Sequence, residues 1–242
     1  MGSDPNYPNG VRPHLLRDYV GALDALRGCG LVGYAQAAVA FLVAWFIYVP
    51  IHELMHAYGC LLAGGEVTRL EIAPEYGGIL LARMFPFVVA GSHYAGQLTG
   101  FDTHGSDAIY LATVLAPYLL TIFVGVPLLR RAARPSTPPE NRPWLFGAAL
   151  PIAYAPFISI FGDYYEAGSI LVSRVVSQID LTHPAARWRS DDLLKLIGEL
   201  AERDPTPDDW LIVAGSFVVG LALALLTYHV GALIAQVGAR HQ

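Results

Sequence analysis

The stretch AWFIYVPIHELMHAYGC, residues 44–60, ends an uncharged apolar run with three titratable side chains. His52, Glu53 and His56 are costly in hydrocarbon, roughly 2.5 to 3.5 kcal/mol for a charged side chain at the centre of a membrane span. Three such residues close together need a common reason. A shared metal ion would supply one.

The composition indicates an integral membrane protein. Of the 242 residues, 54% are apolar and 14% are charged, and the mean hydropathy is +0.44, values typical of membrane chains. Uncharged runs cover residues 31–50, 108–129, 144–162 and, with His229 as the one titratable group, 210–239. Each run can cross about 30 Å of hydrocarbon at about 1.5 Å per residue. We therefore predict an all-α, multi-pass protein with four transmembrane helices in a lipid bilayer.

The periodicity changes after the first span. In EVTRLEI, residues 66–72, Thr68, Leu70 and Ile72 alternate with the intervening side chains, as in a strand. A turn signal separates this run from GGILLARMF, a second extended candidate. We predict a small membrane-associated β-hairpin over residues 66–90, followed by a loop over 91–107.

The predicted organisation has four segments. Residues 1–30 form a polar N-terminal leader, and residues 31–176 form a membrane core of three spans plus the hairpin. Residues 177–209 form a soluble loop with a short amphipathic helix, and residues 210–242 form the final transmembrane helix and tail. The formal net charge of −5 offers no basic surface, so nucleic acid is excluded as a partner.

The five residues HELMH form an H-E-x-x-H motif. On a helix, the four-residue offset places His52 and His56 on one face, where both imidazoles can converge on one ion. Glu53 lies beside that face, where its carboxylate can take a proton from water activated by the ion. The competing interpretation is that these are polar residues satisfied within a helix bundle.

A catalytic zinc site usually has three protein ligands, so a third is needed. His52 lies about 25 to 32 Å from the start of the first span, and Asp163 lies about 28 Å from Trp144, at the start of the third. Because these two spans start on the same side, the two side chains share a depth. Asp163 is the preferred third ligand, and Glu166, about one turn further on, is the alternative.

Three other histidines are weaker candidates. His93 and His104 lie in the predicted loop, near the correct side of the membrane, and are favoured as solvated surface residues. His229 lies in the last span, where we expect it to form a hydrogen bond with another helix.

The segment HELMHAYGCLLAGGEVTRLEI, residues 52–72, resembles the signature region of the site-2 protease family of intramembrane zinc metalloproteases. PIAYAPFISIFGDYYEAG, residues 151–168, is similar to the later helix that supplies an aspartate in this family. LAPYLLTIF, residues 115–123, looks like the family's Gly-Pro helix, with Ala116 in place of the glycine. The chain departs from the family in having Gly and Tyr around Asp163 instead of Leu and Gly, and in lacking an upstream asparagine.

The resemblance implies an enzyme that uses Zn²⁺ to hydrolyse peptide bonds in or near transmembrane segments of membrane-protein substrates. It implies that His52, His56 and Asp163 bind the metal and that Glu53 is catalytic. One alternative is a non-catalytic metal-binding membrane protein, a decayed protease. A second is a transporter in which the same four residues form a metal or proton path, although the uncharged spans beyond the site weigh against it.

Overall fold

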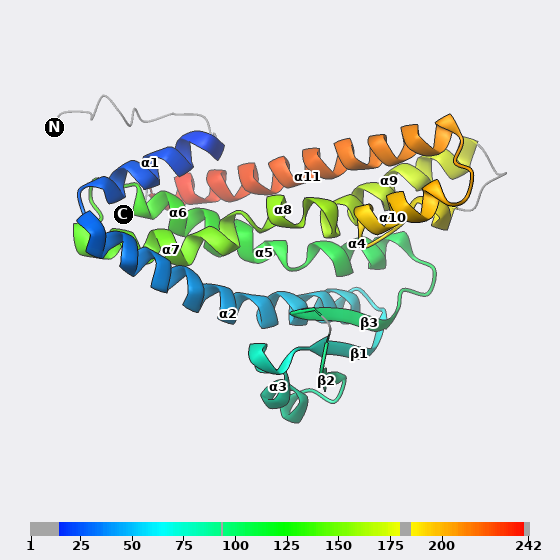
Figure 1. The fold of residues 1–242 in the computed structure, drawn as a ribbon, viewed down its shortest axis with the longest axis horizontal. Helices are drawn as coiled ribbons and strands as arrows, with labels where there is room; N and C mark the ends of the chain where they lie inside the picture. Colours follow the sequence, from blue (N-terminus) through cyan, green and yellow to red (C-terminus); the bar gives the residue numbers. More distant parts are fainter. Residues whose placement is uncertain (1–14, 93, 180–184, 240–242) are drawn as a thin grey trace.

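The computed structural model describes residues 15–92, 94–179 and 185–239, and it is mostly helical (Figure 1). In chain order, the elements up to the last strand are α1 (Leu15–Arg27), α2 (Gly30–Leu62), β1 (Glu66–Ile72), η1 (Pro74–Tyr76), α3 (Gly78–Met84), β2 (Val88–Ala90) and β3 (Gly96–Asp102). The remaining elements are α4 (Asp107–Leu115), α5 (Tyr118–Leu120), the π-helix η2 (Thr121–Gly125), α6 (Val126–Ala132), η3 (Pro139–Asn141), α7 (Arg142–Ala153), α8 (Ala155–Ile158), η4 (Ser159–Phe161), α9 (Asp163–Ile179), η5 (Ala185–Trp188), α10 (Leu193–Ala201) and α11 (Pro207–Ala239).

Two helices, α2 and α11, are each long and apolar enough to cross a membrane. Two further candidates are pairs of helices bent at a break, by 50° between α4 and α5–α6 and by 44° between the η3–α7 segment and α8–η4. The part of the chain that the structure describes thus contains two to four candidate membrane spans. The four predicted runs correspond to these elements if each bent pair is one span.

Prolines account for the breaks in the two bent pairs. Pro117 lies in the break between α4 and α5, and Pro127 is the second residue of α6, just after η2 ends at Gly125. A proline has no backbone N–H and its ring clashes with the preceding turn, so a regular α-helix bends or widens around it. Pro156 lies in the same way just after the α7–α8 break. The bends are therefore encoded locally.

Glycines allow the helices to approach closely. A Cβ at Gly147 of α7 would overlap the backbone carbonyl of Ala37 in α2, and a Cβ at Gly168 of α9 would overlap that of Ser216 in α11. Gly220 of α11 faces the backbone of Tyr164 in the same interface. Small residues at such crossings are typical of helix packing in membranes, where close contact replaces the hydrophobic driving force.

A three-stranded sheet with strand order β2-β1-β3 follows the first long helix (Figure 1). β1 pairs with β2 in parallel, with Leu70 opposite Val88, and with β3 antiparallel, with Leu70 opposite Leu98. Leu70 and Val88 are buried in a small cluster with Ala57 of α2. This cluster fixes the sheet against the second half of α2, beside the H-E-x-x-H motif.

The prediction of a β-hairpin over residues 66–90 was wrong. The two strands in that range are parallel, and the expected extended run GGILLARMF, residues 77–85, instead forms helix α3 over Gly78–Met84. Its Leu, Ala, Arg and Met residues are good helix formers, and Gly77 supplies a left-handed turn (φ 81°) just before the helix. The antiparallel partner of β1 is β3, which lies within the predicted loop over 91–107. Its two glycines, Gly96 and Gly100, weaken the strand pattern.

Two segments outside the spans also contain helices. Within the predicted leader, α1 buries Ala22 and Leu26 against the core of the bundle. Within the predicted loop over 177–209, the expected short amphipathic helix is α10, which buries three leucines in a cluster with Tyr165 and Val213. Residues 1–14 of the leader lie outside the described residues.

The α9–α11 contact gives a stability prediction. Gly220→Ala places a methyl group against the backbone of Tyr164, whereas Gly215→Ala on the same helix meets nothing within 4 Å. We expect Gly220→Ala to lower the free energy of unfolding by about 1 to 3 kcal/mol. We expect Gly215→Ala to leave it unchanged or raise it by about 0.5 to 1 kcal/mol. Unfolding in mixed detergent micelles, followed by circular dichroism, measures both. Equal effects would contradict the close crossing.

Candidate metal centre

The two motif histidines lie on one face of α2, as the helical spacing predicts. Their Nε2 atoms are 3.1 Å apart, and the two rings meet nearly edge to face. Helix α2 continues through Pro50, so the motif stays on a regular helix. Both histidines are buried, with 9% of the surface of each residue exposed. The sequence therefore sets the relative placement of these two side chains.

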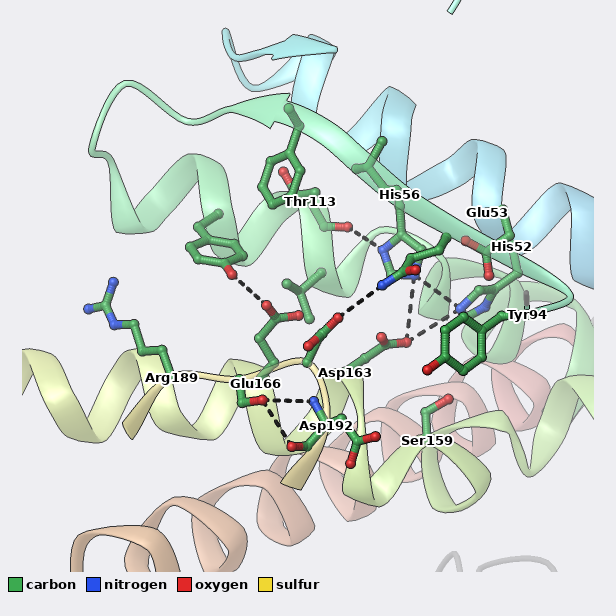
Figure 2. A pocket seen from close by; sticks show the side chains of 18 of the residues that line it. His52, Glu53, His56, Tyr94, Thr113, Ser159, Asp163, Glu166, Arg189 and Asp192 are labelled. Atoms are coloured by element: carbon green, nitrogen blue, oxygen red, sulfur yellow. Dashed lines mark hydrogen bonds and ion pairs between the residues drawn. The ribbon is translucent and has the colours of Figure 1, made fainter. Parts of the chain in front are cut away.

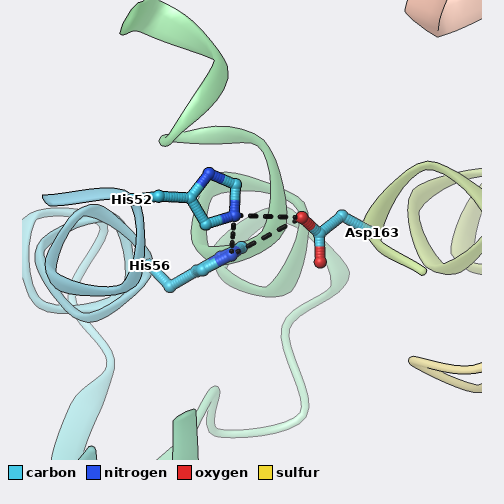
Figure 3. A group of neighbouring side chains, drawn as sticks. All are labelled: His52, His56 and Asp163. Carbon is cyan, nitrogen blue, oxygen red and sulfur yellow. Dashed lines mark hydrogen bonds and ion pairs between the residues drawn. The ribbon is translucent and has the colours of Figure 1, made fainter. Parts of the chain in front are cut away.

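Asp163 completes the group from the other side of the bundle (Figure 3). Its Oδ2 atom lies 3.4 Å from Nε2 of His52 and 3.6 Å from Nε2 of His56. The helix pattern placed Asp163 at the far end of the third span. In the structure Asp163 instead begins a new helix, α9, after a break at Gly162. This break turns the chain so that the first turn of α9 faces α2.

Glu166, the alternative third ligand, is held elsewhere. The hydroxyl of Tyr110 in α4 donates to Oε1 of Glu166 at 2.5 Å. The structure thus brings Asp163, and not Glu166, together with the two histidines.

Of the other candidate histidines, the two that the structure describes, His104 and His229, do not join the group. His104 lies 3.5 Å from its near neighbour Asp102, and half of its side-chain surface is exposed. His93 lies outside the described residues. His229 contacts the carbonyl of Leu225 on its own helix, so the expected bond to another helix is not what the structure shows.

Hydrogen bonds to Nδ1 orient both imidazole rings. Nδ1 of His56 lies 2.9 Å from the carbonyl oxygen of Thr113, which can only accept. In its neutral form His56 therefore carries its proton on Nδ1, and the Nε2 lone pair is then available to a metal ion. Nδ1 of His52 lies 2.7 Å from the hydroxyl of Tyr48, which can accept in the same way. A metal ligand held through its other ring nitrogen is the usual arrangement in proteins.

The three ligand atoms fit a divalent ion such as zinc. Metal-to-ligand distances of about 2.0 to 2.2 Å in a tetrahedral site place neighbouring ligand atoms about 3.3 Å apart. The observed separations are 3.1, 3.4 and 3.6 Å. Two neutral imidazoles and a carboxylate would also leave three lone pairs facing one another, and a cation between them removes that repulsion. The group could therefore hold a metal ion with a fourth position open.

Glu53 lies beside this group and is backed by the sheet (Figure 2). A Cβ at Gly96 of β3 would overlap the side chain of Glu53, with Cδ only 2.9 Å away. The strand backbone therefore packs directly on the glutamate and limits its movement. The absence of a side chain at position 96 is what allows this contact.

A cavity of about 690 Å³ gives access to the group. Its walls come from α2, β3, α4, α9 and the segment that leads into α10 (Figure 2). Arg189 of that segment pairs with Asp107 at the start of α4, at 2.6 Å. Gln97 of β3 donates to Asp191 across the cavity, at 3.3 Å. The exposed residues Asp191 and Lys195 lie on the wall, so the cavity reaches the surface there.

Sequence reasoning missed several residues that shape the site. Tyr48 lies four residues before His52, so helical spacing alone could have placed it on the motif face. Thr113 contributes a backbone atom, which no side-chain motif reveals. Gly96 lay in a predicted loop, and Tyr118 lay within a uniformly apolar span, so neither carried a distinctive signal.

Comparison of this chain with models of protein families, with curated proteins and with solved structures found no match. The findings thus support a possible metal-binding group of His52, His56 and Asp163 in a helical protein with candidate membrane spans.

Proposed function

We propose that this protein is an intramembrane zinc metalloprotease that resembles the site-2 protease family. The observation that carries the proposal is the convergence of His52, His56 and Asp163 on the wall of a cavity that Glu53 also lines. Two imidazoles and one carboxylate, with an adjacent glutamate, form the donor set of a hydrolytic zinc site.

Each residue has a distinct role in the proposed reaction. A zinc ion bound at the group would supply Lewis acidity, lowering the pKa of water toward about 7 and polarising the carbonyl of the scissile bond. Glu53 accepts the proton of the attacking water on its carboxylate and passes it to the nitrogen of the leaving amine. Its contact with Gly96 keeps that carboxylate facing the cavity. Tyr48 and Thr113 keep the imidazole rings in place.

The position of the group along α2 suggests the substrate class. His52 lies 22 residues after Gly30, the first residue of α2, or about 33 Å along the helix axis. If α2 enters the hydrocarbon at Gly30, this distance supports a site near the far boundary of a bilayer whose hydrocarbon is about 30 Å thick. Water can enter there, and a peptide bond in or near a transmembrane segment of another protein can reach the same depth.

The sheet supports the binding of an unwound substrate segment. A peptide bond inside a helix is shielded by its own hydrogen bonds, so the substrate must become extended before attack. β3 is an edge strand of the sheet and lines the cavity, so an extended segment can pair with its free edge. The strand suited to this role is Gly96–Asp102, beyond the range of residues 66–90 in which the sequence pattern placed both strands.

Metal analysis tests the ligand set. We expect purified wild-type protein to bind about one zinc ion per chain. His56→Ala and Asp163→Ala should lose most of this zinc, because each removes one of three ligands. Glu166→Gln should retain it, because Glu166 contacts Tyr110 and not the histidines. Elemental analysis after dialysis against a weak chelator gives the occupancy. Zinc retained by Asp163→Ala and lost by Glu166→Gln would reverse the assignment.

Glu53→Gln separates an enzyme from a non-catalytic metal protein. The amide keeps the size of the side chain but cannot accept a proton, so cleavage should fall by about 10²- to 10⁴-fold. Zinc content should be unchanged, because Glu53 is not one of the three grouped ligands. Cleavage is followed on tagged single-span model substrates reconstituted with the protein in proteoliposomes. Wild-type protein that binds zinc but has the same activity as Glu53→Gln would favour the decayed-protease alternative.

Gly96→Ala tests whether the sheet positions Glu53. The added methyl group must displace the Glu53 side chain, and a displacement of about 1 Å can cost about 100-fold in rate. Gly100→Ala is the matched control, because its methyl group meets Thr68 and Arg69 on the same sheet, away from Glu53. We expect both variants to keep their zinc and only Gly96→Ala to lose cleavage to this extent. Equal losses would indicate general damage to the strand.

A further inference from the structure

The hydroxyl of Tyr118 directly contacts the group of His52, His56 and Asp163. It donates to Oδ2 of Asp163 at 2.5 Å, and this oxygen is also the one nearest to the histidine Nε2 atoms. Tyr118 begins helix α5, immediately after the break at Pro117, and only 1% of its surface is exposed. A third element, between α2 and α9, therefore reaches the atom on which the ligand set converges.

The Tyr118 ring has little freedom to move. It packs edge to face on His52, with centroids 5.6 Å apart, and tilts against Tyr164, with centroids 4.4 Å apart. Both tyrosines belong to one buried cluster that also includes Tyr48. Because the ring is fixed on two sides, the direction of its O–H bond toward Asp163 is fixed as well.

We propose that Tyr118 is a positioning residue that presents Asp163 to the metal through Oδ2 alone. A carboxylate oxygen has two lone pairs. When Tyr118 occupies one of them, the other faces the two imidazoles. The same hydrogen bond opposes rotation of the carboxylate, so Oδ1 does not swing toward the ion and occupy the position needed by water. This inference rests on the proposed zinc site.

A second buried tyrosine shows what a purely structural hydroxyl does here. Tyr164 is fully buried and packs edge to face against Tyr118, but its hydroxyl donates to Thr227 of α11 at 2.8 Å, away from His52, His56 and Asp163. A buried hydroxyl needs a partner, and either bond satisfies that need. Only the Tyr118 bond ends on an atom of the ligand set. The two residues thus form a matched pair for experiment.

The experiment compares Tyr118→Phe with Tyr164→Phe in the full-length chain. Each variant removes one buried hydroxyl and keeps the ring. Zinc affinity is measured by competition with a chromogenic chelator, and the visible spectrum is recorded after loading with Co²⁺. We expect Tyr118→Phe to lower zinc affinity by about 10- to 100-fold, the usual effect of losing a hydrogen bond to a ligand. We also expect its Co²⁺ spectrum to change, because the carboxylate can now bind through both oxygens. Tyr164→Phe should match wild type in both measurements.

A double-mutant cycle covers the case in which Tyr118→Phe also weakens the fold. If Tyr118 acts through Asp163, then adding Tyr118→Phe to Asp163→Ala should change the remaining affinity by no more than about twofold. An equal loss of affinity with and without Asp163 would overturn the proposal, as would an affinity and spectrum of Tyr118→Phe equal to those of Tyr164→Phe. Wild-type protein that binds no metal would instead contradict the proposed zinc site itself.

Discussion

The structure depends on one electrostatic constraint, the convergence of three ligand atoms inside a helical bundle. Nε2 of His52, Nε2 of His56 and Oδ2 of Asp163 all lie within 4.8 Å of one another. Such groups are costly in an apolar environment, and their lone pairs repel one another unless positive charge lies between them. Helix geometry brings the two histidines together, but Asp163 comes from a helix more than one hundred residues later. The packing of α2 relative to α9 must therefore be fixed by other contacts.

Helix α4 provides those contacts because it packs against both α2 and α9. Toward α2, its Thr113 carbonyl binds His56, and the backbone of Ala112 lies so close that Gly59 has no space for a Cβ. Toward α9, its Tyr110 hydroxyl binds Glu166. The two carboxylates that the sequence offered as third ligand, Asp163 as the preferred one and Glu166 as the alternative, thus have separate tasks: Asp163 belongs to the candidate ligand set and Glu166 joins α9 to α4. A short helix in a bent span is well suited to this position, because it can tilt to meet both neighbours.

Local patterns in the sequence predicted the possible metal-binding group of His52, His56 and Asp163 better than they predicted the architecture around it. The motif on α2 has a fixed helical offset, and residue counts along two spans brought Asp163 to the depth of His52 even though a break at Gly162 separates it from the third span. The sheet was harder, because GGILLARMF suits a strand or a helix at that length, and the glycines of β3 hide its periodicity. Contacts such as Tyr118 with Asp163, 45 residues apart, depend on the tertiary arrangement of bent helices. No local pattern encodes them.

Strand β3 links the proposed chemistry to the opening of the cavity. Gly96 lies against the side chain of Glu53, and the next residue, Gln97, donates to Asp191 on the opposite wall. One edge of β3 pairs with β1, so the other edge is available for main-chain pairing with a peptide beside His52, His56 and Asp163. A peptide in a helix uses its carbonyl groups in its own hydrogen bonds, whereas a peptide paired with an edge strand leaves alternate carbonyl groups free. Under the proposed function, a site that combines an edge strand, a possible metal-binding group and a fixed glutamate would suit a substrate that enters as a helix and reacts in an extended conformation.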